Sequence, residues 1–174
     1  MTDSETPPAP DFELSNVGAG SSPVSLSELA SDPGIRGVLL LFQRDLHCTN
    51  CRAQVQDVAE RYAEFQELGV EVLSVLPEAA DRAREWQDRY ELPYPLLADP
   101  DASVGEAYDQ PVRFGVLGSL SDFLGRMPEA VVVDLRTDPR IVAAHRGRST
   151  WDRPDVDGLL ALVRDGLDGS PDRD

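Results

Sequence analysis

Lysine is absent from this sequence of 174 residues: the 16 basic residues are all arginines, against 32 Asp and Glu residues. Phosphate backbones bind to basic surfaces, so a formal net charge of −16 argues against a nucleic-acid partner. Carboxylates in such excess repel one another unless salt screens them. The composition therefore predicts a halophilic host, and an ordinary solvated acidic surface is the alternative.

Thermal stability distinguishes these two interpretations. At about 1 M salt the Debye length falls to ~3 Å, so repulsion between surface carboxylates is screened. We expect the melting temperature, followed by circular dichroism, to rise between low salt and molar salt. A melting temperature that stays flat or falls over that range contradicts the halophilic interpretation.

Long apolar runs are missing too, and there is no apolar stretch behind a basic N-terminus. The sequence therefore predicts neither a membrane span nor a secretory signal, and it favours a cytoplasmic protein without a membrane partner. A chain of this length is expected to form one domain. We place that domain at residues 11–167, with a disordered, proline-rich tail at 1–10 and a frayed tail at 168–174.

Cysteine is scarce: the chain has only Cys48 and Cys51. The apolar run at 38–42 precedes them and is typical of a strand buried in a parallel sheet. Apolar residues that recur at three- and four-residue spacing follow them and predict one buried face of a helix: Val55, Val58, Ala59, Tyr62 and Phe65. Both cysteines are therefore expected in the first turn of a helix, beyond the end of a central strand.

That position has chemical consequences for the two thiols. The partial positive charge at a helix N-terminus stabilises a thiolate, so the pKa of one thiol should fall from roughly 8.5 towards neutrality. The second sulfur lies about one turn away, so the pair can close a disulfide after attacking a substrate. Zinc takes about four ligands, and beyond the thiols the sequence offers only His47 and His145. A zinc site and an inert core pair are the alternatives to a redox dithiol, which the C-x-x-C spacing favours, without metal or organic cofactor.

The rest of the sequence alternates strand and helix patterns and predicts a central mixed sheet with helices on both faces. Strands or extended segments are expected near residues 12–14, 37–43, 70–76, 92–99, 130–134 and 140–146. Helices are expected near 49–68, 78–91, 100–108 and 156–167. Residues 109–127 have no clean period and are interpreted as an insertion.

This α/β order is thioredoxin-like, and residues 10–167 resemble the peroxiredoxin-like (AhpC/TSA) branch of the thioredoxin superfamily. Four segments carry the resemblance: 11–14 with 24–27, 60–75, 90–101 and 128–134. The resemblance implies a thioredoxin-like fold and an oxidoreductase with an antioxidant role. It implies as substrate a disulfide-containing protein or a hydroperoxide, and as partner a thiol reductant that the sequence does not identify.

The family's motif around its peroxide-reducing thiol, Pro-x-x-x-Thr-x-x-Cys, is only partly present. Aligning its cysteine with Cys51 puts Arg44 at the proline and Cys48 at the threonine. The family's arginine before the penultimate strand falls near Pro128, which resembles instead the cis-proline of thioredoxins. We therefore predict a cis bond between Met127 and Pro128, close to the cysteines.

Several polar residues near the motif are candidates for supporting the thiols. Arg52, Arg44 or Arg126 can replace the missing family cation. His47 either stabilises a thiolate and exchanges its proton near neutral pH, or is an exposed turn residue. The segment 148–154 is interpreted as the entry to the closing helix, capped by Asp152 or a neighbouring polar group.

The sequence thus predicts a thiol–disulfide oxidoreductase that cycles Cys48 and Cys51. In this scheme Cys48 attacks and Cys51 resolves, because the first cysteine lies where the helix dipole is strongest. One alternative is a peroxiredoxin-type thiol peroxidase that reduces hydroperoxides through Cys51. Another is a redox-sensing or partner-binding module that turns nothing over, since one fold serves many activities.

Overall fold

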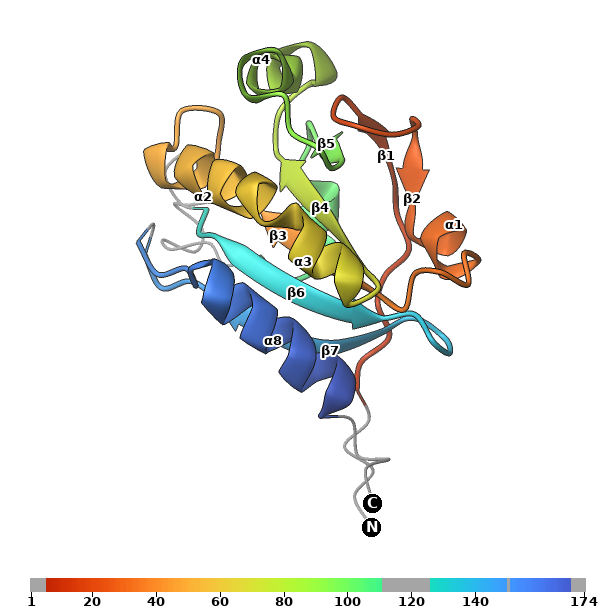
Figure 1. Ribbon diagram of the computed structural model, residues 1–174. Helices are drawn as coiled ribbons and strands as arrows, with labels where there is room; N and C mark the ends of the chain where they lie inside the picture. The colour runs from red at the N-terminus through yellow and green to blue at the C-terminus, as the bar shows by residue number, and fades with distance from the viewer. Residues whose placement is uncertain (1–5, 111–125, 150, 170–174) are drawn as a thin grey trace.

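The computed structural model describes residues 6–110, 126–149 and 151–169. These residues form a seven-stranded mixed sheet in the order β2-β1-β5-β4-β3-β6-β7 (Figure 1). Its strands are β1 (Glu13–Asn16), β2 (Val24–Ser25), β3 (Gly37–Phe42), β4 (Val70–Leu76), β5 (Leu96–Ala98), β6 (Glu129–Asp134) and β7 (Arg140–Arg146). The three central strands β3, β4 and β5 run parallel, and the flanking pairs run antiparallel to their neighbours.

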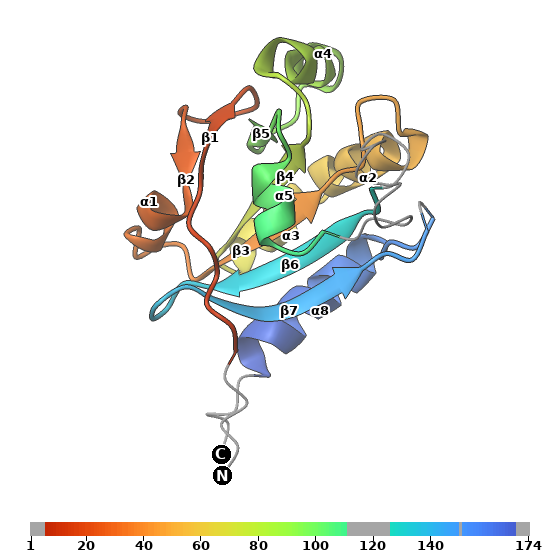
Figure 2. The same ribbon diagram turned by 180° about the vertical axis from the view of Figure 1, so that it is seen from behind.

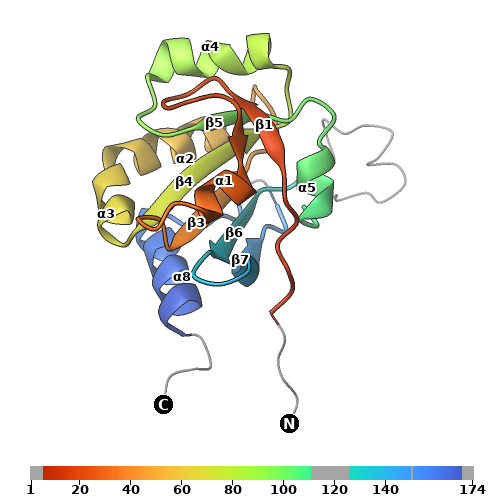
Figure 3. The same ribbon diagram turned by 90° about the vertical axis from the view of Figure 1, so that its right-hand side faces the viewer.

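Helices cover both faces of the sheet, which confirms the predicted α/β, thioredoxin-like class. One face carries α2 (Thr49–Glu60), α3 (Tyr62–Glu67) and α8 (Val156–Asp168), as Figure 1 shows. The opposite face, turned to the viewer in Figure 2, carries α1 (Leu26–Ala30) and α5 (Ser103–Ala107). Figure 3 shows these two layers from the side, with α4 (Ala80–Tyr90) across the end of the molecule.

Strand β3 is the centre of both cores, as its apolar run predicts. All six of its residues are buried. Leu39 and Leu41 pack with Val55 and Val58 of α2 into the first core. Phe42, at the end of β3, belongs to the second core, on the side of α5. Because both faces of β3 are fixed by packing, the loop that follows it starts from a rigid point beneath α2.

The helix expected at 49–68 is broken into two at Arg61, which leaves the helical conformation at φ −119°. Its guanidinium binds Glu64 within the next turn and Asp157 of α8, 2.8 Å away, so the break lies where α8 crosses the end of α2. Gly69 then ends α3 with φ +73°, a left-handed conformation that favours glycine. The chain turns there into β4, whose predicted bounds the structure reproduces.

Residues 6–10, predicted to lie in the N-terminal tail, follow the outer edge of β7. Pro8 forms a bridge with Arg140, and the Ile141 N–H donates to the Pro7 carbonyl at 2.9 Å. Prolines lack an N–H but accept hydrogen bonds well, so they can pair with one edge of a strand without extending the sheet.

Most of the predicted insertion at 109–127 lies outside the described residues.

Among the helices that the structure describes, none is both long and apolar enough to cross a membrane.

Candidate active site

The loop between β3 and α2 places the two cysteines at the start of the helix. Asp45 is buried, and its carboxylate accepts the His47 N–H at 2.7 Å while its carbonyl accepts the Cys48 N–H at 3.4 Å. Cys48 is the N-cap of α2, and its Sγ accepts the Cys51 N–H at 3.2 Å. Sulfur therefore takes the capping position that an oxygen usually fills, one residue before the first turn in which the sequence predicts Cys48.

Cys48 and Cys51 form a disulfide across one helical turn, with their Cα atoms 5.2 Å apart. Cys48 is 5% exposed and Cys51 is fully buried. Cys51 Sγ also accepts the backbone N–H of Arg44 at 3.4 Å. Each sulfur thus faces a backbone donor that can stabilise negative charge once the disulfide is reduced.

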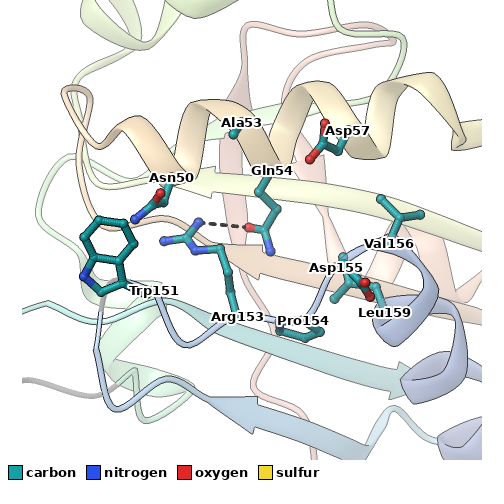
Figure 4. A pocket seen from close by; sticks show the side chains of 10 residues that line it. All are labelled: Asn50, Ala53, Gln54, Asp57, Trp151, Arg153, Pro154, Asp155, Val156 and Leu159. Atoms are coloured by element: carbon teal, nitrogen blue, oxygen red, sulfur yellow. Dashed lines mark hydrogen bonds between the residues drawn. The ribbon is translucent and has the colours of Figure 1, made fainter.

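The Arg153 guanidinium contacts both sulfurs, and the sequence analysis does not predict this role for it. Its Nη2 lies 3.4 Å from Cys51 Sγ and 3.8 Å from Cys48 Sγ. Its Nη1 lies 3.4 Å from Gln54 Oε1 of α2, the contact drawn in Figure 4. Burial, followed by the positive charge of nearby Arg44, lowers the pKa of Arg153 to about 10, so the guanidinium is still charged at neutral pH.

A closed turn before α8 directs Arg153 towards α2. The Asp152 carboxylate accepts the Arg148 N–H at 2.8 Å and lies 3.1 Å from His145 Nε2. The backbone hydrogen bond from Arg148 and the contact with His145 hold the pKa of Asp152 below its usual range. Asp155, not Asp152, caps α8 by accepting the Gly158 N–H. Sequence reasoning missed Arg153 because nothing local reveals that this turn passes beside the N-terminus of α2.

The three arginines predicted to support the thiols have other side-chain partners. Arg52 donates through Nε to the Leu46 carbonyl at 3.0 Å and so fixes the loop before Cys48. Arg44 Nε lies 3.5 Å from Asp45 Oδ2, and the Arg44 backbone N–H donates to Cys51 Sγ. Arg126 is buried and donates to the Gln110 side chain at 3.4 Å. Arg126 and Arg44 line a separate cavity of about 210 Å³.

The predicted cis bond at Met127–Pro128 is wrong. Within the described residues the cis peptide bond is Ser22–Pro23, and Met127–Pro128 is trans. The Met127 carbonyl accepts from the Gln110 side chain at 3.0 Å, and the Pro128 carbonyl accepts the Gly147 N–H at 2.9 Å. These bonds hold an extended backbone that continues into β6.

Two more of the predicted supporting residues, Pro128 and His47, lie close to the disulfide, in space or in the sequence. Pro128 lines a small pocket together with Gln54 and Arg153, so it lies near the residues that contact the disulfide. His47 is exposed, and its backbone N–H binds Asp45. A supporting role for either side chain stays a prediction.

In the described part of the chain, no three His, Cys, Asp or Glu side chains are grouped to hold a metal ion.

Glu129 is a buried carboxylate at the start of β6, next to the end of β3. Its side chain is fully buried, and Arg146 Nε lies 2.6 Å from its Oε2. Burial raises the pKa of Glu129 to about 7, although Arg146 opposes that shift. The folded state therefore holds a proton between about pH 4.5 and pH 7 that the unfolded state has lost.

Replacing Glu129 with glutamine should stabilise the protein at pH 8 and change little at pH 5. The folded state binds the extra proton, so wild-type stability falls as the pH rises from about 4.5 to about 7, and the neutral amide escapes this loss. We expect a gain of about 1–3 kcal/mol in the free energy of unfolding at pH 8, measured by denaturant titration. Glu60→Gln on the exposed face of α2 is the control. Equal effects of the two variants at both pH values contradict the prediction.

Comparison with known proteins agrees with this fold. The model of the AhpC/TSA family matches residues 6–136. A putative peroxiredoxin bcp of Haemophilus influenzae is 30% identical over 123 residues, which cover 71% of each chain. The thiol-disulfide oxidoreductase ResA of Oceanobacillus iheyensis is 31% identical over 103 residues, which cover 58% of this chain and 51% of ResA. This chain thus matches only about half the length of ResA.

Among solved structures, peroxidoxin BcpB from Mycobacterium tuberculosis superposes with a TM-score of 0.73 at 22% identity, over 91% of this chain and 95% of that one. A likeness at this identity supports the fold. Together with the family match, it leads to one conclusion: the chain belongs to the AhpC/TSA family, with a C-x-x-C pair at its site. One relative is named a thiol-disulfide oxidoreductase and another a putative peroxiredoxin, which agrees with the predicted enzyme class, an oxidoreductase.

Proposed function

We propose that this protein is a thiol–disulfide oxidoreductase that cycles Cys48 and Cys51. One observation carries the proposal: the two sulfurs form a disulfide at the N-terminus of α2, with the more exposed sulfur at the capping position. The ResA relative carries the same activity in its name. A small disulfide beneath a helix N-terminus can open and close without rearrangement of the sheet, as turnover requires.

In the reducing direction, the Cys48 thiolate attacks one sulfur of a substrate disulfide. A mixed disulfide with Cys48 forms, and the other substrate sulfur leaves as a thiolate. Cys51, one turn along α2, then loses its proton and attacks the Cys48 sulfur. The Cys48–Cys51 disulfide forms again and the second substrate thiolate leaves, so two electrons pass to the substrate. A thiol reductant restores the dithiol by the reverse exchange.

Arg153 supports both steps because its guanidinium contacts both sulfurs. A cation within about 4 Å stabilises the thiolate over the thiol, and the Cys51 N–H and Arg44 N–H add hydrogen bonds to each sulfur. The charge passes from Cys48 to Cys51 during the cycle, and one guanidinium serves both positions. Arg153 thus takes the role that the family gives to an arginine near the position of Pro128.

Reduction of hydroperoxides through Cys51 is the second candidate function. Cys51 aligns with the family's peroxide-reducing cysteine, and its sulfur has two donors, the Arg44 N–H and Arg153. The thiolate would attack the peroxide oxygen, release an alcohol or water and become a sulfenic acid, which Cys48 would condense to the disulfide with loss of water. The bcp relative, named a putative peroxiredoxin, favours this candidate.

An activity panel separates the two candidates. The reduced protein is offered insulin, a small model disulfide, hydrogen peroxide and an organic hydroperoxide, each at low and molar salt. Dithiothreitol serves as reductant. The proposal expects disulfide reduction well above the uncatalysed rate and slow consumption of peroxide. Rapid peroxide consumption with no disulfide reduction selects the peroxidase, and inactivity on every substrate selects the non-catalytic sensor.

We also propose, from the sequence, that the protein has a cytoplasmic location and comes from a halophilic host.

A further inference from the structure

A cavity of about 230 Å³ lies between α2 and the segment that leads into α8. Asn50, Gln54 and Asp57 line it from α2, on one helical face that begins two residues after Cys48. Trp151 and Arg153 line it from the other side, as Figure 4 shows. Sites for drug-sized molecules span about 300–1,000 Å³, so this cavity suits a single large side chain.

Arg153 connects this cavity to the disulfide. Its guanidinium forms part of the cavity wall, and the same group lies 3.4 Å from Cys51 Sγ and 3.8 Å from Cys48 Sγ. A group that contacts this guanidinium in the cavity is therefore separated from the sulfurs by the guanidinium alone. In a peptide whose cysteine reacts with Cys48, the next Cα is about 3.8 Å from that of the cysteine, and a large side chain on it extends the reach past the guanidinium.

The walls of the cavity select for charge and shape. Trp151 is 79% exposed, the one large hydrophobic residue so exposed among those described, and its ring stands at one end of the cavity (Figure 4). Asp57 and Asp155 lie towards the other end and are both acidic, so two carboxylates face one cation, Arg153, whose guanidinium already contacts Gln54 and Cys51. An exposed indole offers a face for an aromatic ring or a guanidinium, and the carboxylates repel an anion. The net charge of −16 adds to this repulsion.

We propose that this cavity binds the side chain next to the reactive cysteine of a disulfide-bonded protein substrate, and that it selects an aromatic or basic side chain over an acidic one. The inference rests on the proposed disulfide exchange and names its substrate class. Small anionic disulfides, such as that of glutathione, are then poor substrates. They offer no aromatic or basic side chain to Trp151 and carry carboxylates towards Asp57 and Asp155.

Matched peptide substrates test this selection. Four short peptides carry one cysteine joined by a disulfide to thionitrobenzoate, and they differ only in the next residue: Phe, Arg, Ala or Asp. The second-order rate constant of the reduced protein is read from the released chromophore. We expect the Phe and Arg peptides to react at least about 10-fold faster than the Asp peptide. Trp151→Ala should bring the Phe:Asp ratio close to that of the free thiol dithiothreitol, whereas Trp151→Phe should retain most of it.

Charge is tested by a second pair of variants. Asp57→Asn should lower the Arg:Ala ratio several-fold at low salt, and Asp88→Asn, an exposed aspartate on α4, should leave it unchanged. Equal rates for all four peptides, or a Trp151→Ala variant with an unchanged Phe:Asp ratio, overturn the proposal while disulfide exchange itself stands.

A binding measurement separates this inference from the proposed function. The same peptides with serine in place of cysteine are titrated into the oxidised protein, and the emission of Trp151 is followed, with Trp151→Phe as the blank for buried Trp86. A blue shift with the Phe and Arg peptides, but not with the Asp peptide, supports the cavity. If that shift occurs in a protein that reduces no disulfide, the cavity stands and the redox proposal fails. If no peptide shifts the emission, the cavity is not the binding site.

Discussion

Replacing Cys48 with serine is expected to abolish disulfide exchange and leave the fold intact. Cys48 is the more exposed sulfur and the N-cap of α2, so it meets a substrate first and gains most from the helix N-terminus. Serine is itself a good N-cap, so its oxygen can accept the Cys51 N–H in place of sulfur. Insulin reduction should fall to the background rate, and the thermal unfolding of the reduced variant should match that of the reduced wild type.

The matched variant, Cys51→Ser, is expected to keep the attacking thiol and lose the resolving one. It should therefore accumulate a mixed disulfide with the substrate through Cys48, visible by mass spectrometry and released by dithiothreitol. If Cys51 proves the faster thiol towards iodoacetamide, and Cys48→Ser still consumes peroxide, the roles are reversed. The peroxidase candidate would then account for the site.

The sequence predicts the position of the dithiol because the signals for it are local. The buried run at 38–42 identifies the central strand, and the apolar spacing after Cys51 identifies the helix face that packs on it. A helix that follows such a strand after a short loop has its first turn just beyond the C-terminal end of the strand. Two cysteines in that turn must lie together, and the structure places them so.

The contact of Arg153 with the sulfurs and the trans peptide bond before Pro128 could not be predicted from local signals. Arg153 is about 100 residues from the cysteines in sequence, and it reaches them because the Asp152 turn and the packing of α8 bring it there. The two predicted arginines close in sequence, Arg44 and Arg52, have local side-chain partners instead; Arg52, for example, donates to the Leu46 carbonyl. The likeness of Pro128 to a cis-proline ignores Gln110, whose amide binds the Met127 carbonyl and holds an extended backbone. The position of Arg153 and the backbone at Pro128 both depend on tertiary contacts.

Replacing Arg153 with methionine is expected to slow alkylation of the attacking thiol at pH 7 by about 10-fold or more. Methionine fills the same space without charge, so the variant removes the cation that lies within 3.8 Å of both sulfurs. An opposite charge at such a distance moves a pKa by about 1–3, so the pKa of the attacking thiol should rise and its thiolate fraction at pH 7 should fall. The measurement is the rate of iodoacetamide reaction against pH, in the Cys51→Ser background so that one thiol reports.

The reduction potential is a second measurement. A mutation that only weakened the packing of the site would not produce the same shift. The cation favours the dithiol form through its thiolate, so Arg153→Met should make the potential more negative by about 30 mV for each tenfold loss of stabilisation. Arg153→Lys should recover part of both effects, because it restores the charge without the two-nitrogen geometry that reaches Gln54 and the sulfurs together. Arg148→Met, an exposed arginine in the same turn, removes one charge at a distance and should change neither value. If Arg153→Met and Arg148→Met behave alike, the guanidinium at the sulfurs has a packing role, and backbone donors alone activate the thiol.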